Sequence, residues 1–406
     1  MGIARRYIDR NGRLMAYKKP DLSKFRLETR LALAGRDPAR FEGAVNPSVQ
    51  RATTLLIDDA DDLYNSSRQT YGLVGMGVQQ ALREALMAIE GGAGGVLAPS
   101  GLAACTLALT TVAKAGGEVL MTDAVYGPTR RFCEVTLKKL GVTTRFFDPR
   151  VGAGIADLIT ASTCGIFLES PGSLTFEVQD VPAISAAAKT RGVPVILDNT
   201  WSAGVCFKPF DHGVDLSVQA LTKYQGGHAD VFMGAVIAAQ PDFARRVLLT
   251  YKQLGLNASP DDAYLALRGL RTLSVRLERQ SASALKIARW LESHAHVGRV
   301  LHPALESHPD HAIWKRDFSG SSGLFGVVLR PASAASLKTM LESLEIFAMG
   351  FSWGGYESLI VPSDENIQRC AAPWRAEGPL LRLSIGVEHP DDLIADLEQG
   401  FAHLSA

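Results

Sequence analysis

The chain has 406 residues, of which 47% are hydrophobic and 21% charged, so it can form a packed core and is not a disordered polymer. Its 42 Lys and Arg balance its 42 Asp and Glu to a net charge of zero. This balance gives no general electrostatic attraction to nucleic acid or to an anionic membrane. At about 150 residues per domain, the length predicts two or three domains.

The cysteines and histidines show no disulfide or metal pattern. The five cysteines are scattered and contain no Cys-x-x-Cys pair, which favours reduced thiols in the cytoplasm. The nine histidines include no His-Glu-x-x-His motif, so we expect no metal site. The basic N-terminus lacks the apolar core of a signal peptide, and no window reaches the ~20 apolar residues of a membrane span. We therefore expect a soluble cytoplasmic protein.

The chain begins with an arm and continues as a regular alternation of strands and helices. Residues 1–75 are polar and turn-rich, which predicts an N-terminal arm that packs against another surface, including another subunit. Apolar residues at helical spacing from Val78 to Ile89 then predict a helix. Further strands are predicted at residues 95–98, 118–122, 142–147, 164–169, 193–198, 214–220 and 231–238, and further helices from Gly101 to about residue 115, at 128–140 and at 181–190. Continuous apolar strands that alternate with helices predict a mostly parallel sheet covered on both faces, over residues 76–270.

The pattern changes after a helical stretch that begins near residue 261. Strands are predicted at residues 322–330, 345–349 and 380–387, and helices at 333–344 and 390–404. This order predicts a smaller C-terminal α+β domain over residues 271–406. The expected fold class is α/β with a second domain.

Four polar features occur where predicted strands end. Asp198 closes one strand, Lys223 follows another, Tyr126 follows a third, and Pro99-Ser100-Gly101-Leu102 forms a strand-to-helix turn. Each alone has an ordinary explanation as a cap, a surface charge or a turn. In a parallel sheet, however, the carboxyl ends of the strands share one edge, where ligands bind.

Together these features match one cofactor. A lysine can bind an aldehyde covalently, an acid can pair with a pyridinium nitrogen, a helix N-terminus can hold a phosphate, and a tyrosine can stack on an aromatic ring. Pyridoxal 5'-phosphate carries all four groups. The sequence therefore predicts a pyridoxal-phosphate site.

The same segments resemble the pyridoxal-phosphate-dependent transsulfuration enzymes of cysteine and methionine metabolism, most closely the bacterial cystathionine β-lyases. The resemblance extends over residues 43–396, and its most specific part is residues 215–228 around Lys223, where Leu221 and Gln225 are imperfect matches. Residues 169–173 (Glu-Ser-Pro-Gly-Ser) and 352–358 are typical of the β-lyases and not of their γ-acting relatives. The resemblance implies the aspartate-aminotransferase-like fold, known as fold type I.

The resemblance also implies roles for individual residues. Lys223 would bind the cofactor and move the Cα proton, Asp198 would pair with the ring nitrogen, and Tyr126 would stack on the ring. The amides of Gly101 and Leu102 and the hydroxyl of Thr222 would bind the phosphate. The substrate would be bound by Arg382, Ser352, Trp353 and Arg131. Tyr71 corresponds to a tyrosine that reaches a neighbouring subunit's phosphate. This implies a homo-oligomer, expected to be a tetramer made of two active dimers.

Three positions depart from the family pattern. Leu73 stands where an arginine usually binds phosphate, Arg131 where related lyases have an acid, and Phe351 where a tyrosine is common. The changes at the expected distal pocket are either neutral drift or a shift in thioether preference, in which Arg131 would favour an anionic or neutral distal group. The effect of Leu73 on cofactor affinity stays open.

Three functions therefore remain. The first is α,β-elimination of L-cystathionine to homocysteine, pyruvate and ammonia, in methionine biosynthesis. The second is a related reaction on another S-substituted cysteine or amino acid in a specialised pathway. The third is a non-catalytic member of the family, which the retention of Lys223, Asp198, Tyr126 and Arg382 argues against. We favour the first.

Overall fold

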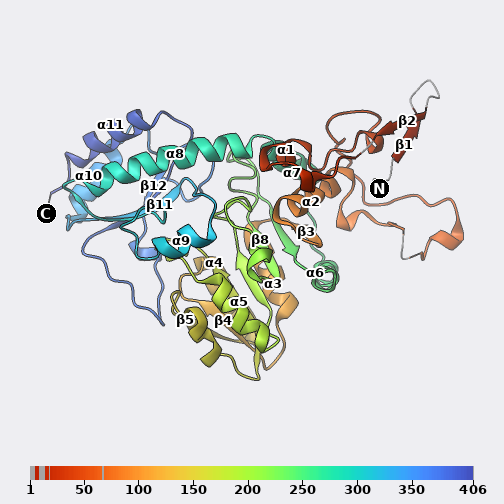
Figure 1. Ribbon diagram of the computed structural model, residues 1–406, viewed down its shortest axis with the longest axis horizontal. Helices are drawn as coiled ribbons and strands as arrows, with labels where there is room; N and C mark the ends of the chain where they lie inside the picture. The colour runs from red at the N-terminus through yellow and green to blue at the C-terminus, as the bar shows by residue number, and fades with distance from the viewer. Residues whose placement is uncertain (1–4, 9–13, 18, 66–67, 406) are drawn as a thin grey trace.

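The computed structural model describes residues 5–8, 14–17, 19–65 and 68–405. Figure 1 shows two bodies, each built around a sheet, with the long helix α8 (Leu273–Glu292) extending along both, and an N-terminal arm on the side opposite the C-terminus. Within the described residues, no helix is both long and apolar enough to cross a membrane.

The large body contains a seven-stranded sheet in the order β3-β9-β8-β7-β6-β4-β5. Strands β5, β4, β6, β7 and β8 are parallel, and β9 is antiparallel to both of its neighbours. The strands are β3 (Gly94–Ala98), β4 (Glu118–Thr122), β5 (Thr143–Phe147), β6 (Thr163–Glu169), β7 (Val195–Asp198), β8 (Leu216–Gln219) and β9 (Gly234–Ala238). The predicted, mostly parallel sheet is confirmed.

Helices cover both faces of this sheet, because the strands are apolar on both sides. Ile196 and Leu197 are consecutive in β7 and lie in different hydrophobic cores, the first with α3 and α6 and the second with α2 and α5. The helices of the large body are α2 (Gly77–Glu90), α3 (Gly101–Val112), α4 (Gly127–Arg131), α5 (Val181–Thr190), α6 (Pro241–Gln253) and α7 (Pro260–Leu270). Helix α4 continues into a π-helical turn at Phe132–Leu137, within the helix predicted for residues 128–140.

The small body contains an antiparallel four-stranded sheet in the order β10-β11-β13-β12. Its strands are β10 (Val297–Leu301), β11 (Leu324–Leu329), β12 (Leu359–Pro362) and β13 (Leu380–Ser384), and its helices are α8, α9 (His311–Asp317), α10 (Ala334–Ser343) and α11 (Pro390–Phe401). One face of this sheet forms a separate core with α10 and α11, while Leu301, Leu324, Val328 and Leu380 belong to a core shared with the large body. The predicted small C-terminal α+β unit is present, while the domain boundary at residue 270 stays a prediction.

The strand predicted at residues 345–349 is wrong. In this segment only Ala348 makes a bridge, to Leu359, and the edge strand of the sheet is β12 instead. The backbone N–H groups of residues 345, 346 and 347 donate to the Asp396 carboxylate at 2.8–3.0 Å. A side chain of α11 therefore binds the backbone groups that a strand partner would otherwise bind.

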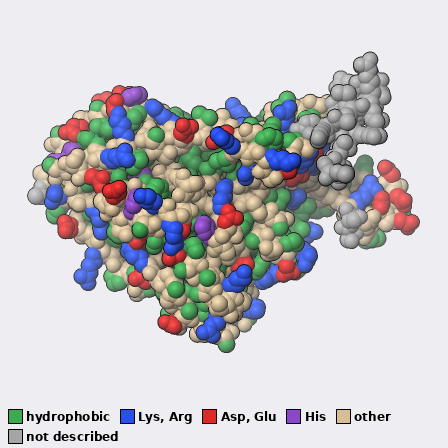
Figure 2. Space-filling view, in the orientation of Figure 1, with side chains coloured by type: hydrophobic (Ala, Val, Ile, Leu, Met, Phe, Trp, Pro, Cys, Tyr) green, Lys and Arg blue, Asp and Glu red, His purple; other side chains and the backbone are tan. Residues whose placement is uncertain are grey.

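The arm is partly packed and partly projecting. The strands β1 (Arg5–Ile8) and β2 (Leu14–Tyr17) form a hairpin, and α1 (Leu27–Leu33) packs against α2 and α8. Beyond α1, residues 55–65 stand away from the large body in Figure 1, and Figure 2 shows acidic side chains at the far end of this segment, which contains Asp58, Asp59, Asp61 and Asp62. Leu56 and Tyr64 are each 91% exposed. Exposed apolar side chains on a projecting segment are typical of a surface that another chain covers.

Candidate active site

Lys223 lies in the turn after β8 and reaches the small body. Its Nζ donates a hydrogen bond to Ser352 Oγ at 3.0 Å and lies 5.2 Å from the centre of the Trp353 ring. Burial, and then the positive charge of Arg382, lowers the pKa of Lys223 to about 8, against an opposing effect of Asp198. About a tenth of this amine is therefore neutral at pH 7, far more than of an ordinary lysine, as a nucleophile or base requires.

Asp198 is the last residue of β7, paired in register with Val218 of β8. Its Oδ1 accepts hydrogen bonds from the Thr200 N–H at 3.1 Å and the Thr200 hydroxyl at 2.5 Å, and the Cys105 thiol lies 3.5 Å from Oδ2. Burial raises the pKa of Asp198, while these donors and the charge of Lys223 lower it. Thr200 thus holds one carboxylate oxygen, while the other has only the long contact with the Cys105 thiol.

Tyr126 immediately precedes α4 and is positioned through its backbone. Its N–H donates to Glu169 Oε2 at 2.7 Å, and its side chain is 44% exposed. Burial, followed by the electrostatic influence of Cys105, Glu169 and Asp198, raises the pKa of the Tyr126 hydroxyl, which Arg382 opposes. The tyrosine therefore lies among the residues at the strand ends with its ring available for stacking.

The N-terminus of α3 lies against the turn that precedes Lys223. Ser100 caps the helix by accepting from the Ala103 N–H at 3.1 Å. A Cβ added to Gly101 would lie 2.5 Å from the Cβ of Ala220, so the close approach requires glycine. The Thr222 hydroxyl is also fixed here, because it contacts both the N–H and the carbonyl of Met233 at 3.0 and 3.2 Å. Leu102 follows on the exposed side of the first turn.

Arg382 brings a cation from the small sheet to this edge. It lies in the middle of β13, is only 9% exposed, and donates to the carbonyls of Phe351 and Ser352 at 2.9 and 3.1 Å. Its Nε is buried and has no hydrogen-bond acceptor in the described part of the chain. Burial lowers the pKa of Arg382 to about 10. A buried guanidinium with an unused donor is suited to bind an anionic group.

Two positions at the expected distal pocket, Arg131 and Phe351, depart from the family pattern, and both are exposed. Arg131 is exposed and Phe351 is 78% exposed. Arg130, the residue before Arg131, is buried, forms an ion pair with Asp123, and stacks on Phe146 with its guanidinium carbon 3.6 Å from the ring centre. Arg130 therefore cannot contact a distal substrate group, and only Arg131 is free to do so.

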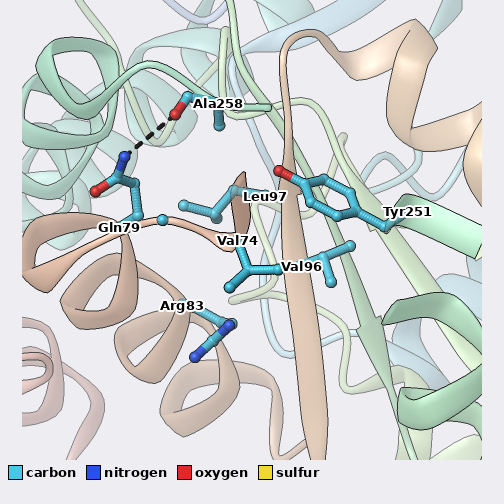
Figure 3. Close-up of a pocket in the computed structure, with 8 residues that line it drawn as sticks. Val74, Gln79, Arg83, Val96, Leu97, Tyr251 and Ala258 are labelled. Carbon is cyan, nitrogen blue, oxygen red and sulfur yellow. Dashed lines mark hydrogen bonds between the residues drawn. The ribbon is translucent and has the colours of Figure 1, made fainter. Parts of the chain in front are cut away.

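Tyr71 and Leu73 lie in the arm, where Tyr71 is 57% exposed. The carbonyl of Leu73 accepts from Asn257 Nδ2 at 2.9 Å. The next residue, Val74, lines a cavity together with Arg83 and Tyr251 (Figure 3). Its volume of about 10 Å³ is the least that holds one water, and none of its lining residues belongs to the Lys223 site.

Sequence reasoning gave no individual role to Glu169 or Cys105. Glu169 ends β6 and pairs in register with Asp198 in β7, so it lies at the same sheet edge. Burial, together with the charge of Asp198, holds the pKa of Glu169 well above its usual range. The strand-end rule that identified Asp198 would also have found Glu169. Cys105 has no such signal, because it lies inside the apolar sequence of α3.

The imperfect match at Gln225 has a structural explanation. Its side chain is buried and donates to Gln219 Oε1 at 2.8 Å, and Gln219 in turn donates to Glu90 Oε1 at 2.6 Å. Asn199, next to Asp198, donates to the same Glu90 oxygen at 2.9 Å. A glutamine at position 225 thus joins a buried network that links the lysine turn to the end of β7.

Comparison with known proteins now identifies the family. The profile of the Cys/Met metabolism PLP-dependent enzymes matches residues 28–402. The chain belongs to this family. It is 47% identical to a putative cystathionine β-lyase of Rhizobium johnstonii, with 94% of this chain and 97% of that protein covered, and 43% identical to the cystathionine β-lyase MetC of Escherichia coli, with 93% and 99% covered.

A solved structure gives the same result for the fold. Cystathionine γ-synthase from Xanthomonas oryzae, in complex with cystathionine, superposes with a TM-score of 0.87 at 32% identity, covering 93% of this chain and 98% of that one. The fold-type-I architecture is thereby confirmed. The cofactor is pyridoxal phosphate, and the predicted class, a pyridoxal-phosphate-dependent carbon–sulfur lyase, is confirmed.

The residues of this site fit that cofactor. A free lysine amine and a buried acid occur at the ends of adjacent strands, and the close approach at Gly101 places a helix N-terminus against the lysine turn. The cofactor carries a matching aldehyde, ring nitrogen and phosphate.

Proposed function

We propose that the protein cleaves the Cβ–S bond of L-cystathionine by α,β-elimination, giving homocysteine, pyruvate and ammonia with the uptake of one water. The observation that supports this most is the meeting of Lys223 with Ser352 and Trp353, the motif typical of the β-lyases, beside the buried Arg382. With Lys223 as the base and Arg382 as the carboxylate-binding group, the two would lie side by side, as removal of a Cα proton requires.

Each residue has a defined task in this reaction. When bound, pyridoxal phosphate supplies an electron sink for the negative charge left at Cα. Asp198 keeps the ring nitrogen protonated, and Tyr126 stacks on the ring. Arg382 binds the substrate α-carboxylate through its planar fork. Lys223 Nζ takes the Cα proton and is then placed to give a proton to the departing sulfur.

The phosphate is proposed to lie against the first turn of α3. The amides of Gly101 and Leu102 point out of a helix N-terminus, where N–H groups lack intrahelical acceptors. The Thr222 hydroxyl and Tyr71 of a second copy complete the set. Because Leu73 carries no donor, we expect weaker cofactor binding than with an arginine at that position, by the ~1.5–3 kcal/mol of a charge-assisted hydrogen bond.

The exposed residues at the expected distal pocket favour a second class of substrate. Arg131 and Phe351 both face solvent and replace groups that would suit the distal ammonium and carboxylate of cystathionine. A cation at this rim favours S-substituted cysteines with a neutral or anionic distal group. The catalytic residues would be the same.

We further propose that the protein works in the cytoplasm as a homo-oligomer, with Tyr71 contributed to the neighbouring site. The exposed apolar residues of the arm and the exposure of Tyr71 support this. Two such dimers, each with complete active sites, would form the tetramer that the resemblance to the family implies.

The test is to load the purified protein with pyridoxal phosphate, add L-cystathionine, and follow pyruvate and free thiol together. We expect equal amounts of both products, and neither from Lys223→Ala. Visible absorbance of lysine-bound cofactor without products would mean that the substrate is another S-substituted cysteine. Comparing kcat/KM over a panel of neutral and anionic S-conjugates would then identify it. Absence of that absorbance would contradict the catalytic proposal.

A further inference from the structure

The loop between β12 and β13, residues 363–379, leaves the small sheet and contacts the large body, and Figure 1 shows it extending toward α4. Its base is closed where the Leu380 N–H donates to Asp364 Oδ2 at 2.8 Å and the Ser363 N–H donates to the Leu380 carbonyl at 2.8 Å. At its tip is the segment Arg369–Ala372, which we call the clasp.

One half of the clasp binds Asp123 through its backbone. The N–H groups of Cys370, Ala371 and Ala372 donate to the same oxygen, Asp123 Oδ2, at 2.9, 2.7 and 2.9 Å. The other oxygen of Asp123 pairs with Arg130, and both side chains are at most 4% exposed. Three amides on one buried carboxylate oxygen are a strong, directional attachment.

The other half of the clasp binds a second loop of the large body. The Arg369 guanidinium donates to the Thr175 hydroxyl and to Glu177 Oε1 at 3.0 Å, and both charged side chains are at most 8% exposed. Residues 172–177 follow the end of β6, and the Ser173 N–H donates to the Ala124 carbonyl at 2.7 Å. The clasp therefore joins both loops that border Tyr126.

Tyr126 lies between the two residues that this attachment fixes. Asp123 precedes it by three positions and Arg130 follows it by four, and the two are paired with each other. On the other side, the loop that carries the clasp returns directly into β13, which holds Arg382. The clasp thus connects the segment that carries Tyr126 with the strand that carries Arg382.

We propose that the clasp is a positioning element for substrate binding. It sets the distance between the cofactor groups of the large body and the carboxylate-binding Arg382 of the small sheet. The inference rests on the proposed function, because it takes Arg382 as the carboxylate ligand. The residues of the clasp touch neither substrate nor cofactor and act through Tyr126 and Arg382.

The test measures the equilibrium binding of glycine, which has the amine and carboxylate of the substrate and no β-carbon to eliminate, by its effect on cofactor absorbance. In Asp123→Ala and Arg369→Ala we expect glycine to bind at least ~5-fold more weakly, with the cofactor still bound, as for a typical coupling between sites. Should Asp123→Ala fail to fold, Arg369→Ala and the thiol measurement below decide the matter.

A matched control is available in α9. Arg316 pairs with Asp180 at 2.7 Å and so also joins the small body to the large one, by a contact that involves none of the site residues. We expect Arg316→Ala to change glycine binding by less than about 2-fold, the scale of an exposed ion pair. Equal weakening in the control and in the clasp variants would show a general stabilising role and overturn the inference.

Cys370 provides a readout that is independent of activity. It is the exposed cysteine of the described chain, and its thiol lies 3.4 Å from Asp123 Oδ1. If glycine binding and the closed clasp stabilise each other, glycine should lower the fraction of molecules with an open clasp and so slow the reaction of Cys370 with an aromatic disulfide. Cys370→Ser identifies the thiol that reacts. No protection by glycine would overturn the proposal.

An error in the proposed function and an error in the clasp proposal give different results in the glycine measurement. If Arg382→Leu binds glycine as tightly as the unaltered protein, the carboxylate assignment is wrong. If Arg382→Leu weakens glycine binding and the clasp variants do not, the site assignment stands and the positioning role of the clasp is wrong.

Discussion

The side chains of Lys223 and Ser352 meet at 3.0 Å although they are 129 positions apart in the chain. Lys223 comes from the parallel sheet of the large body and Ser352 from the segment that precedes β12 in the small one. The site therefore lies where the two bodies meet. Its geometry depends on how the two bodies are held together as well as on either sheet alone.

Arg382 is expected to control substrate binding more than turnover. Arg382→Leu removes both the charge and the fork, and losing a charge-assisted hydrogen bond of ~1.5–3 kcal/mol should raise KM roughly 10- to 100-fold. Arg382→Lys should recover part of this loss, since a lysine keeps the charge without the planar geometry. Steady-state kinetics with L-cystathionine measure both. An unchanged KM in Arg382→Leu would refute the assignment.

The lowered pKa of Lys223 predicts how cofactor uptake depends on pH. Only the neutral amine attacks an aldehyde, so uptake by the cofactor-free protein should rise about tenfold per unit of pH up to about 8 and then level off. Arg382 lowers the Lys223 pKa and Asp198 raises it, so Arg382→Leu should move the midpoint to higher pH and Asp198→Asn to lower pH. Rapid-mixing absorbance measures the rate of cofactor uptake. The side-chain amine of Nα-acetyl-lysine is the solvent-exposed reference. A midpoint equal to that of the reference would contradict the prediction.

Gly101 should be intolerant of a side chain. In Gly101→Ala the new Cβ would lie 2.5 Å from the Cβ of Ala220, and overpacking of this kind costs about 1–3 kcal/mol. We expect a lower melting temperature and weaker cofactor binding, because the helix N-terminus moves away from the lysine turn. Gly154→Ala is the control, since its Cβ would lie 3.6 Å from Val151, an ordinary contact. Equal behaviour of the two variants in a cofactor titration would argue against the close approach.

The sharing of sites between subunits can be tested by mixing inactive variants. Tyr71→Ala should lose cofactor affinity and Lys223→Ala should lose activity. A mixed dimer would have one site with both changes and one with neither. After unfolding and refolding equal amounts together, about a quarter of the unaltered activity should return, because about half of the dimers are mixed. No recovery, with mixed dimers verified by differential tags, would place Tyr71 in its own subunit's site.

Much of the large body could be predicted from the sequence, because its signals are local. Continuous apolar strands bounded by polar residues predicted seven strands, and the helix at residues 181–190 was predicted with the observed bounds. Parallel strands place their carboxyl ends at one edge, so Asp198, Lys223, Tyr126 and Gly101 could be grouped without coordinates. The resemblance to known enzymes extended this grouping to Arg382.

Other features depended on contacts between distant parts of the chain, which no local pattern encodes. An apolar segment at residues 345–349 has the composition of a strand, but the Asp396 carboxylate binds its backbone and leaves the edge of the sheet to β12. Arg130 and Arg131 are adjacent and chemically identical, yet only Arg130 meets the buried Asp123. The sequence by itself determined which residues end the strands, because periodicity and burial act over a few positions. The tertiary structure alone decided which of them are paired and which are left to bind a ligand, because that depends on which partner the fold places opposite each charge.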